Sequence, residues 1–182
     1  MATTREALQT AIALEKESMA LYARIARIFA DDPKLQDFWF GMARDEARHV
    51  GALDLVWTVL DLENKLDAPS PISLEDSTIV KLRALLERFQ GEARPGLRIE
   101  RALEMALEVE ETELEDLVAD LLKAVQNPDE YERCLRLLVH DLGELGYMIE
   151  TYCQDAALLA RCDDLCNRHA ESLRHSSVRQ AI

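Results

Sequence analysis

Residues 41–50, GMARDEARHV, place an acidic residue and a histidine on a helix face that is otherwise apolar. Side chains that recur at alternating steps of four and three residues lie on one face of a helix. Around residues 41–50 this stripe comprises Leu35, Trp39, Met42, Glu46, His49, Leu53, Val56 and Leu60. A stripe this apolar predicts a helix with one buried face, and Glu46 and His49 fall on that face.

Three further stretches show the same pattern, each with one acidic residue on a helical stripe. Glu15 interrupts the first stripe and Glu110 the third, while the fourth is more polar and contains Glu144. The members of the fourth stripe are Leu137, His140, Glu144, Tyr147, Thr151, Gln154 and Leu158. The stripes predict four helices that pack around a shared core, with one carboxylate from each helix pointing to its centre.

The stripes also indicate an internal duplication. The first and third superimpose with a constant shift of 95 residues, which places Glu15 on Glu110. The second superimposes on the fourth with a shift of 98 residues, which places Glu46 on Glu144 and the histidine on Tyr147. We assign the difference between the two shifts to the turns, as expected for a duplicated helical hairpin.

Capping and turn residues set the expected helix ends. Thr3 and Glu6 form the S/T-x-x-E capping box of a first helix. Asp32-Pro33 and Asn127-Pro128 each start a new helix, because proline is favoured at the first helical position. The expected helices span residues 3–29, 33–64, 73–89, 97–125 and 128 onwards, where the pattern continues, with or without a bend, towards His169.

The connections predict an all-α bundle with one long crossover. Short turns join the first two long helices and the last two, whereas residues 65–96, which include the short helix, join the middle pair. A helix of about 27 residues is about 40 Å long, a distance that this segment can cover. Ferritin-like four-helix bundles have one such crossover. We expect residues 1–160 to form the four-helix bundle and residues 161–182 a C-terminal helical tail.

The composition argues against several classes of function. Asp and Glu total 35 against 21 Lys and Arg, and this formal charge of −14 argues against nucleic acid, which needs a basic face. No apolar run approaches roughly 18 residues, so we expect no membrane span. The charged N-terminus lacks the apolar core of a signal peptide. Together these features predict a cytoplasmic protein.

Four cysteines lie in the last third of the chain, at positions 134, 153, 162 and 166. Without an export signal, reduced thiols are the simplest interpretation. Cys162, Cys166 and His169 have the spacing i, i+4, i+7 and could hold zinc with a fourth ligand. Free thiols on the buried face of a C-terminal helix are the favoured interpretation, because zinc sites more usually pair closely spaced cysteines across a turn.

Four buried carboxylates need a compensating charge. Burying one ionised carboxylate costs several kcal/mol, and no lysine or arginine lies on the stripes. Protonation could neutralise some of the carboxylates. A pair of divalent metal ions does so better and also explains why the residues are acidic. We therefore interpret the centre as a metal site.

The segment Glu46-Ala47-Arg48-His49 is a Glu-x-x-His motif, and the neighbouring helix carries a lone Glu. AIALEKESMALY (residues 11–22) and GMARDEARHV resemble the first hairpin of rubrerythrin-type, ferritin-like di-iron proteins. LEVEETELEDL (residues 107–117) resembles their third helix, and the likeness covers roughly residues 5–155. It implies a ferritin-like four-helix bundle that binds two iron ions, with manganese or zinc as alternative metals.

The resemblance also implies a role for each residue of the site. The implied metal ligands are Glu15, Glu46, His49, Glu110, Glu113 and Glu144. Of these, Glu46 and Glu144 would bridge two metals, and Glu113 would be a carboxylate that moves when the oxidation state changes. Tyr22 matches a tyrosine that often stands behind the ligands of such proteins and orients one of them.

Two features differ from the family pattern. Tyr147 stands where the second Glu-x-x-His would supply a histidine; it could ligate ferric iron as a phenolate, hydrogen-bond a ligand or fill space. His140, one turn before Glu144, could substitute if the helix shifts. The chain also lacks the two Cys-x-x-Cys pairs of a rubredoxin module, so electrons must come from another protein or a small reductant.

The leading hypothesis is a di-iron oxidoreductase of the peroxidase or ferroxidase type. It would react with peroxide or dioxygen and take electrons from an external donor protein. A second hypothesis is a protein that binds or buffers iron with little turnover. A third is a structural bundle that has lost its metal, with Tyr147 marking the loss. A homodimer would be usual for proteins of this type.

Overall fold

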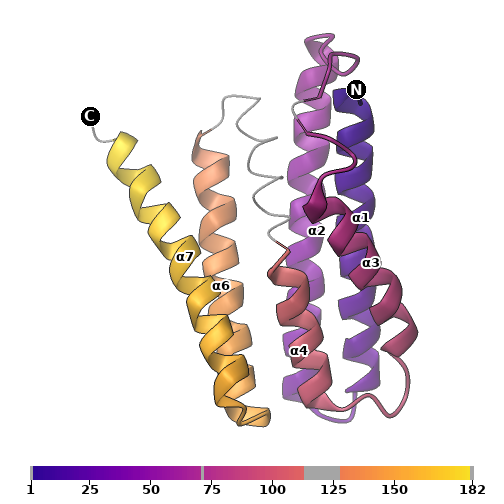
Figure 1. The fold of residues 1–182 in the computed structure, drawn as a ribbon, viewed down its shortest axis with the longest axis vertical. Coiled ribbons are helices and arrows are strands. Elements are labelled where there is room, and N and C mark those ends of the chain that lie inside the picture. The colour runs from indigo at the N-terminus through magenta and orange to yellow at the C-terminus, as the bar shows by residue number, and fades with distance from the viewer. Residues whose placement is uncertain (1, 71, 113–127, 181–182) are drawn as a thin grey trace.

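The computed structural model describes residues 2–70, 72–112 and 128–180, and these residues form an all-α structure (Figure 1). The helices are α1 (Thr4–Ile28), α2 (Pro33–Leu62), α3 (Ser77–Glu92), α4 (Ile99–Glu110), α6 (Pro128–Tyr152) and α7 (Ala156–Gln180). The all-α prediction is therefore confirmed. None of the described helices combines the length and the apolar character that crossing a membrane requires.

The first two helices begin where the capping residues predict. The hydroxyl of Thr3 accepts a hydrogen bond from the backbone N–H of Glu6, whose carboxylate accepts one in return from the N–H of Thr3. The carboxylate of Asp32 accepts hydrogen bonds from the N–H groups of Lys34 and Leu35. These side chains satisfy donors that a helix N-terminus otherwise leaves unpaired. They fix the antiparallel hairpin of α1 and α2.

A short helix, α3, lies within the long connection between α2 and α4. α2 and α4 run in the same direction (Figure 1). α3, which lies between them in the sequence, runs in the opposite direction and packs against α1 (Figure 1). At the start of the crossover, the N–H of Arg5 donates to the carbonyl of Leu66 at 2.8 Å, and that of Thr4 to Ala68 at 2.9 Å. The long connection is thus fastened to the beginning of α1.

All six described helices contribute to one apolar core. Its fully buried side chains include Leu8, Ile25, Leu53, Leu86 and Leu103. α4 begins close to the predicted start of the third long helix. The second half of that predicted helix, with Glu113, lies outside the described residues. The core therefore encloses the middle of α1 and α2, where the predicted ligands lie.

The chain reverses after α6. Gln154 adopts a left-handed conformation, with φ at 53°, and Asp155 then caps α7 by accepting hydrogen bonds from the N–H groups of Ala157 and Leu158. α7 runs antiparallel along α6 (Figure 1). Contrary to the prediction, the fourth helix does not continue towards His169. That residue lies on α7, which is one continuous helix across residues 160 and 161.

α6 is rotated relative to the predicted stripe. Its buried apolar residues are Leu138, Leu142, Leu145, Met148 and Ile149. Glu144 and Tyr147 are exposed instead, the latter by 62%. The cause is α7: Sγ of Cys162 donates to the carbonyl of Leu142 at 3.4 Å, and a Cβ on Gly146 would lie 3.7 Å from that sulfur. The prediction that Glu144 and Tyr147 point to the bundle centre is wrong.

Alanine substitutions on α6 distinguish the observed rotation of this helix from the predicted one. Leu145 is fully buried, so Leu145→Ala should leave a cavity and lower the free energy of unfolding by about 2–5 kcal/mol. Tyr147 is exposed, so Tyr147→Ala should change it by less than about 0.5 kcal/mol. Urea unfolding followed by circular dichroism measures both values. A larger loss of stability in Tyr147→Ala than in Leu145→Ala would instead support the predicted rotation of α6.

Candidate metal centre

Glu15, Glu46 and His49 meet inside the hairpin of α1 and α2. All three are buried, and Glu15 is only 1% exposed. Nδ1 of His49 lies 3.3 Å from Oε2 of Glu46 and 3.6 Å from Oε2 of Glu15. Each residue offers one ligand atom, and these atoms lie within 4.8 Å of one another. The structure thus brings together three of the predicted ligands.

The hairpin itself determines this meeting. Glu15 lies 13 residues before the end of α1 at Ile28, and Glu46 lies 13 residues after the start of α2 at Pro33. Equal distances from one short turn place the two carboxylates at the same height of the antiparallel pair. His49 follows Glu46 by three residues, so both lie on the same face of α2.

α4 brings Glu110 to the same region. The hydroxyl of the fully buried Tyr22 donates to Oε1 of Glu110 at 2.9 Å. The ring of Tyr22 is stacked on Trp39, with 6.0 Å between the ring centroids. Tyr22 is therefore held in place by its neighbour and orients the Glu110 carboxylate, and its role behind metal ligands stays a prediction.

Burial and mutual repulsion keep Glu46 and Glu110 from ionising easily. Burial, followed by the nearby charge of Glu15, raises the pKa of Glu46 to about 8. Burial, followed by the charge of Glu46, raises the pKa of Glu110 to about 8. Burial lowers the pKa of His49, but the carboxylates of Glu15 and Glu46 more than compensate and hold it well above its ordinary value. The group therefore attracts positive charge.

The donor set fits a divalent metal ion. Oε1 of Glu15 is buried and has no hydrogen-bond partner among the described residues. Within the same part of the chain, no lysine or arginine forms an ion pair with Glu15, Glu46 or Glu110. A cation at this point would engage the unpaired oxygen and offset the carboxylate charges. Oxygen and imidazole donors suit iron and manganese and also accept zinc.

Two further acids flank the centre and were missed from the sequence. Asp141 on α6 is half-buried, and burial, followed by the charge of Asp45, raises its pKa to about 6. Asp45 is buried on α2 and forms an ion pair with Arg48. The charge of Asp141 also raises the pKa of Glu110, so these two carboxylates lie close enough to interact. Asp141, rather than Glu144, is the acid that α6 turns inwards.

A single shift along the sequence could have identified Asp141. The shift of 95 residues that relates Glu15 to Glu110 also relates Asp32-Pro33 to Asn127-Pro128. Applied to the second helix, it places Glu46 on Asp141 and His49 on Glu144. The separate shift of 98 residues is therefore unnecessary. One constant shift describes the duplicated hairpin, turn included.

Glu113 lies outside the described residues, and the other remaining predicted site residues do not join the buried group. Glu144 lies at the surface, in a hollow of about 290 Å³ that Asp45, His140 and Asp141 also line. Tyr147 faces solvent further along α6. His140 is exposed, with Nδ1 at 3.2 Å from Oδ1 of Asp141, and does not replace the missing histidine.

Comparisons with known proteins leave the chain without an assigned family. No family model matches the sequence, no curated protein matches it, and no solved structure matches it. The likeness to rubrerythrin-type proteins consequently stays a prediction from the motifs around Glu15, Glu46 and His49. The functional argument depends on the geometry of the centre itself.

Protein stripped of metal with a chelator should lose stability as the pH rises. Glu46 and Glu110 have pKa values raised from 4.5 to about 8. Between these values the folded protein binds more protons than the unfolded chain, so the free energy of unfolding falls with pH. The raised pKa of His49 acts in the same direction above its ordinary value of 6.5. Thermal unfolding at a series of pH values measures the slope.

Glutamine substitutions test the cause of this pH dependence, because they replace a carboxyl group with a carboxamide that does not titrate. Glu46→Gln/Glu110→Gln removes two of the raised carboxyl groups and should flatten the dependence. Glu17→Gln changes an exposed acid on α1, two residues from Glu15, and should leave it unchanged. A stability that rises with pH in the metal-free wild type would contradict the burial of these carboxyl groups.

Proposed function

We propose that the protein binds divalent transition metal through Glu15, Glu46, His49 and Glu110, and that the centre is a carboxylate-bridged di-iron site with redox activity. The observation that carries the proposal is the buried Oε1 of Glu15, which lacks a hydrogen-bond partner among the described residues, in a group of acids whose one basic neighbour there is His49. Such a group is costly for folding alone. A bound metal ion would offset the cost of burying these acids.

A second metal ion would need further oxygen ligands next to the first three. Di-iron carboxylate bundles use a lone Glu from each of two helices and a Glu-x-x-His motif from each of the other two. Here Glu15 and Glu110 match the lone residues, and Glu46-x-x-His49 matches one motif. In the second hairpin, Asp141 occupies the position equivalent to Glu46, whereas Glu144, equivalent to His49, is exposed and lies outside the buried group. This arrangement supports two unequal metal positions.

Bound iron would supply electron-transfer chemistry towards peroxide or dioxygen, as the resemblance to rubrerythrin-type proteins implies. Reduction of hydrogen peroxide to two waters consumes two electrons and two protons. Cys153, Cys162 and Cys166 are free and are not arranged as Cys-x-x-Cys pairs. We therefore assign the electrons to an external donor protein. A homodimer and a cytoplasmic location remain predictions from the sequence.

His49 connects the centre with the surface. The described residues leave a pocket of about 500 Å³ that His49 lines together with Ala52, Leu55 and Leu137. Arg48 and Arg133 contribute its polar part. Mostly apolar pockets with a few polar groups are typical of small-molecule sites. A small oxidant can approach His49 through this opening.

Metal analysis tests the proposed ligands. Protein purified without chelators should contain iron, and Glu15→Gln, which keeps the side-chain shape but removes its charge, should lower the bound metal by more than about tenfold. Added ferrous ion at about 100 times its Kd should raise the stability of the metal-free wild type by about 2.7 kcal/mol. Plasma mass spectrometry and thermal unfolding provide the two measurements.

Glu17→Gln is the matched control, because Glu17 is an exposed acid of the same helix. It should bind as much metal as the wild type. A wild type that contains no metal, and that ferrous, manganous and zinc ions do not stabilise, would refute the proposal. That outcome would favour a structural bundle.

Peroxide consumption in the presence of iron and a supplied reductant tests the redox role. Glu46→Ala and His49→Ala should abolish it, because each removes a ligand. Tyr22→Phe keeps every ligand but loses the hydrogen bond to Glu110, so turnover should fall by about 10–100-fold while the metal content is retained. Unchanged turnover in both ligand variants would exclude this chemistry. Stoichiometric oxidation of ferrous ion without repeated turnover would favour an iron-buffering protein.

A further inference from the structure

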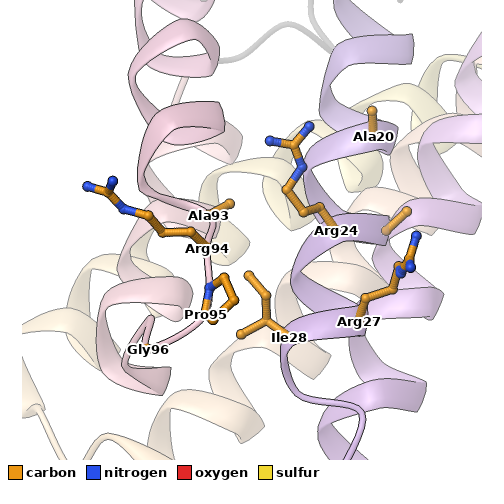
Figure 2. Close-up of a pocket in the computed structure, with 9 residues that line it drawn as sticks. Ala20, Arg24, Arg27, Ile28, Ala93, Arg94, Pro95 and Gly96 are labelled. Atoms are coloured by element: carbon orange, nitrogen blue, oxygen red, sulfur yellow. The ribbon is translucent and has the colours of Figure 1, made fainter.

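A second site lies away from the metal centre, between the last turns of α1 and the loop that joins α3 to α4. It is an open pocket of about 740 Å³, a volume within the range of small-molecule sites. Arg24 and Arg27 border it from α1, and Arg94 belongs to the loop (Figure 2). Arg24 follows Glu15 by nine residues, or about 13.5 Å along the helix, so the two sites are separate.

The pocket is cationic although the chain is acidic. Its lining includes three arginines and no acidic residue, in a chain of net charge −14. None of the three forms an ion pair with a carboxylate of the described residues, whereas the neighbouring Arg88 and Arg101 pair with glutamates at 2.6 Å. The pKa of Glu92 is lowered mainly by Arg101 and in part by the charge of Arg94, so Arg94 has a carboxylate nearby. Arg24 and Arg27 form no ion pair within the described residues, and such guanidinium groups are suited to carboxylate and phosphate groups.

A backbone contact holds Arg24, and the turn of the loop places Arg94. Nη1 of Arg24 donates to the carbonyl oxygen of Gln90 at 3.0 Å and so spans from α1 to α3. Gly96 turns the loop with φ at 94°, a conformation that favours glycine, next to Pro95 and Arg94. The guanidinium of Arg94 points away from α1 in Figure 2. Because this side chain is exposed, a change of rotamer can bring it over the pocket.

The rest of the lining is apolar. Ile28 and Pro95 face each other across the gap in Figure 2, and Ala20, Ala23 and Ala93 complete the wall. Small side chains leave room between α1 and the loop. A fully hydrated inorganic ion would gain nothing from such a wall, whereas a ligand with an apolar body would bury its surface there.

We propose that this pocket binds a small organic anion. Its carboxylate or phosphate group pairs with Arg24, Arg27 and Arg94, and its apolar body lies against Ile28, Pro95 and the alanines. The site is independent of the metal centre, so the two proposals succeed or fail separately.

Phenyl phosphate and benzoate are suitable probes, because they join the two anionic groups to the same apolar ring. Titration followed by two-dimensional 1H–15N NMR on the full chain should shift the amide signals of Ala23, Arg24 and Gly96. Arg24→Gln/Arg27→Gln/Arg94→Gln should weaken the binding of the better probe at least tenfold. Arg83→Gln, an exposed arginine of α3 outside the pocket, should leave it unchanged.

The comparison of the probes identifies the anionic group, and two further ligands test the class. Inorganic phosphate, which lacks the ring, and benzyl alcohol, which lacks the charge, should each bind at least tenfold more weakly than the better probe. Circular dichroism and metal content should be the same in the triple variant as in the wild type. Absence of binding by both probes, equal binding by the triple variant, or equal binding of inorganic phosphate would overturn the proposal.

Discussion

The removal of several acidic side chains from water, with one histidine and no described lysine or arginine to pair with them, is the constraint on which the centre depends. Glu15, Glu46 and Glu110 are buried between α1, α2 and α4, where each ionised carboxylate costs several kcal/mol. Apolar residues of similar volume would make a more stable core. The surrounding leucines and the Tyr22–Trp39 stack offset the penalty without removing its cause. This excess of buried carboxylates over basic groups supports a bound cation more strongly than any single motif does.

The first hairpin could be predicted from the sequence because its geometry is local. Asp32-Pro33 fixes the turn, and the apolar stripes on either side identify the faces that meet. Once the turn is fixed, the separations of Glu15 and Glu46 from it determine their common height. No distant segment has to be placed. The buried Glu15, Glu46 and His49 therefore followed from spacing alone.

The fourth long helix could not be placed in the same way, because two neighbours compete for its faces. Leu138, Leu142 and Leu145 form its stronger apolar stripe, and the structure turns this stripe towards α7. The prediction followed the acidic residue at Glu144 instead. It also lacked the reversal at Gln154 and Asp155, which depends on one left-handed residue. The rotation of a helix depends on the helix that packs against it, and the position of α7 could not be read from the sequence.

The shift of 95 residues gives the centre an inherent asymmetry. It places His49 on Glu144, so the first hairpin offers both an imidazole and carboxylates to the proposed metal site, whereas the corresponding positions of the second hairpin are both acids. The burial is unequal too, because Glu46 is enclosed whereas Asp141 is half-buried and Glu144 is exposed. Imidazole favours the transition metals over purely oxygen-preferring ions. In the proposed metal centre, an ion beside His49 would therefore be held more selectively and further from water than one beside Asp141.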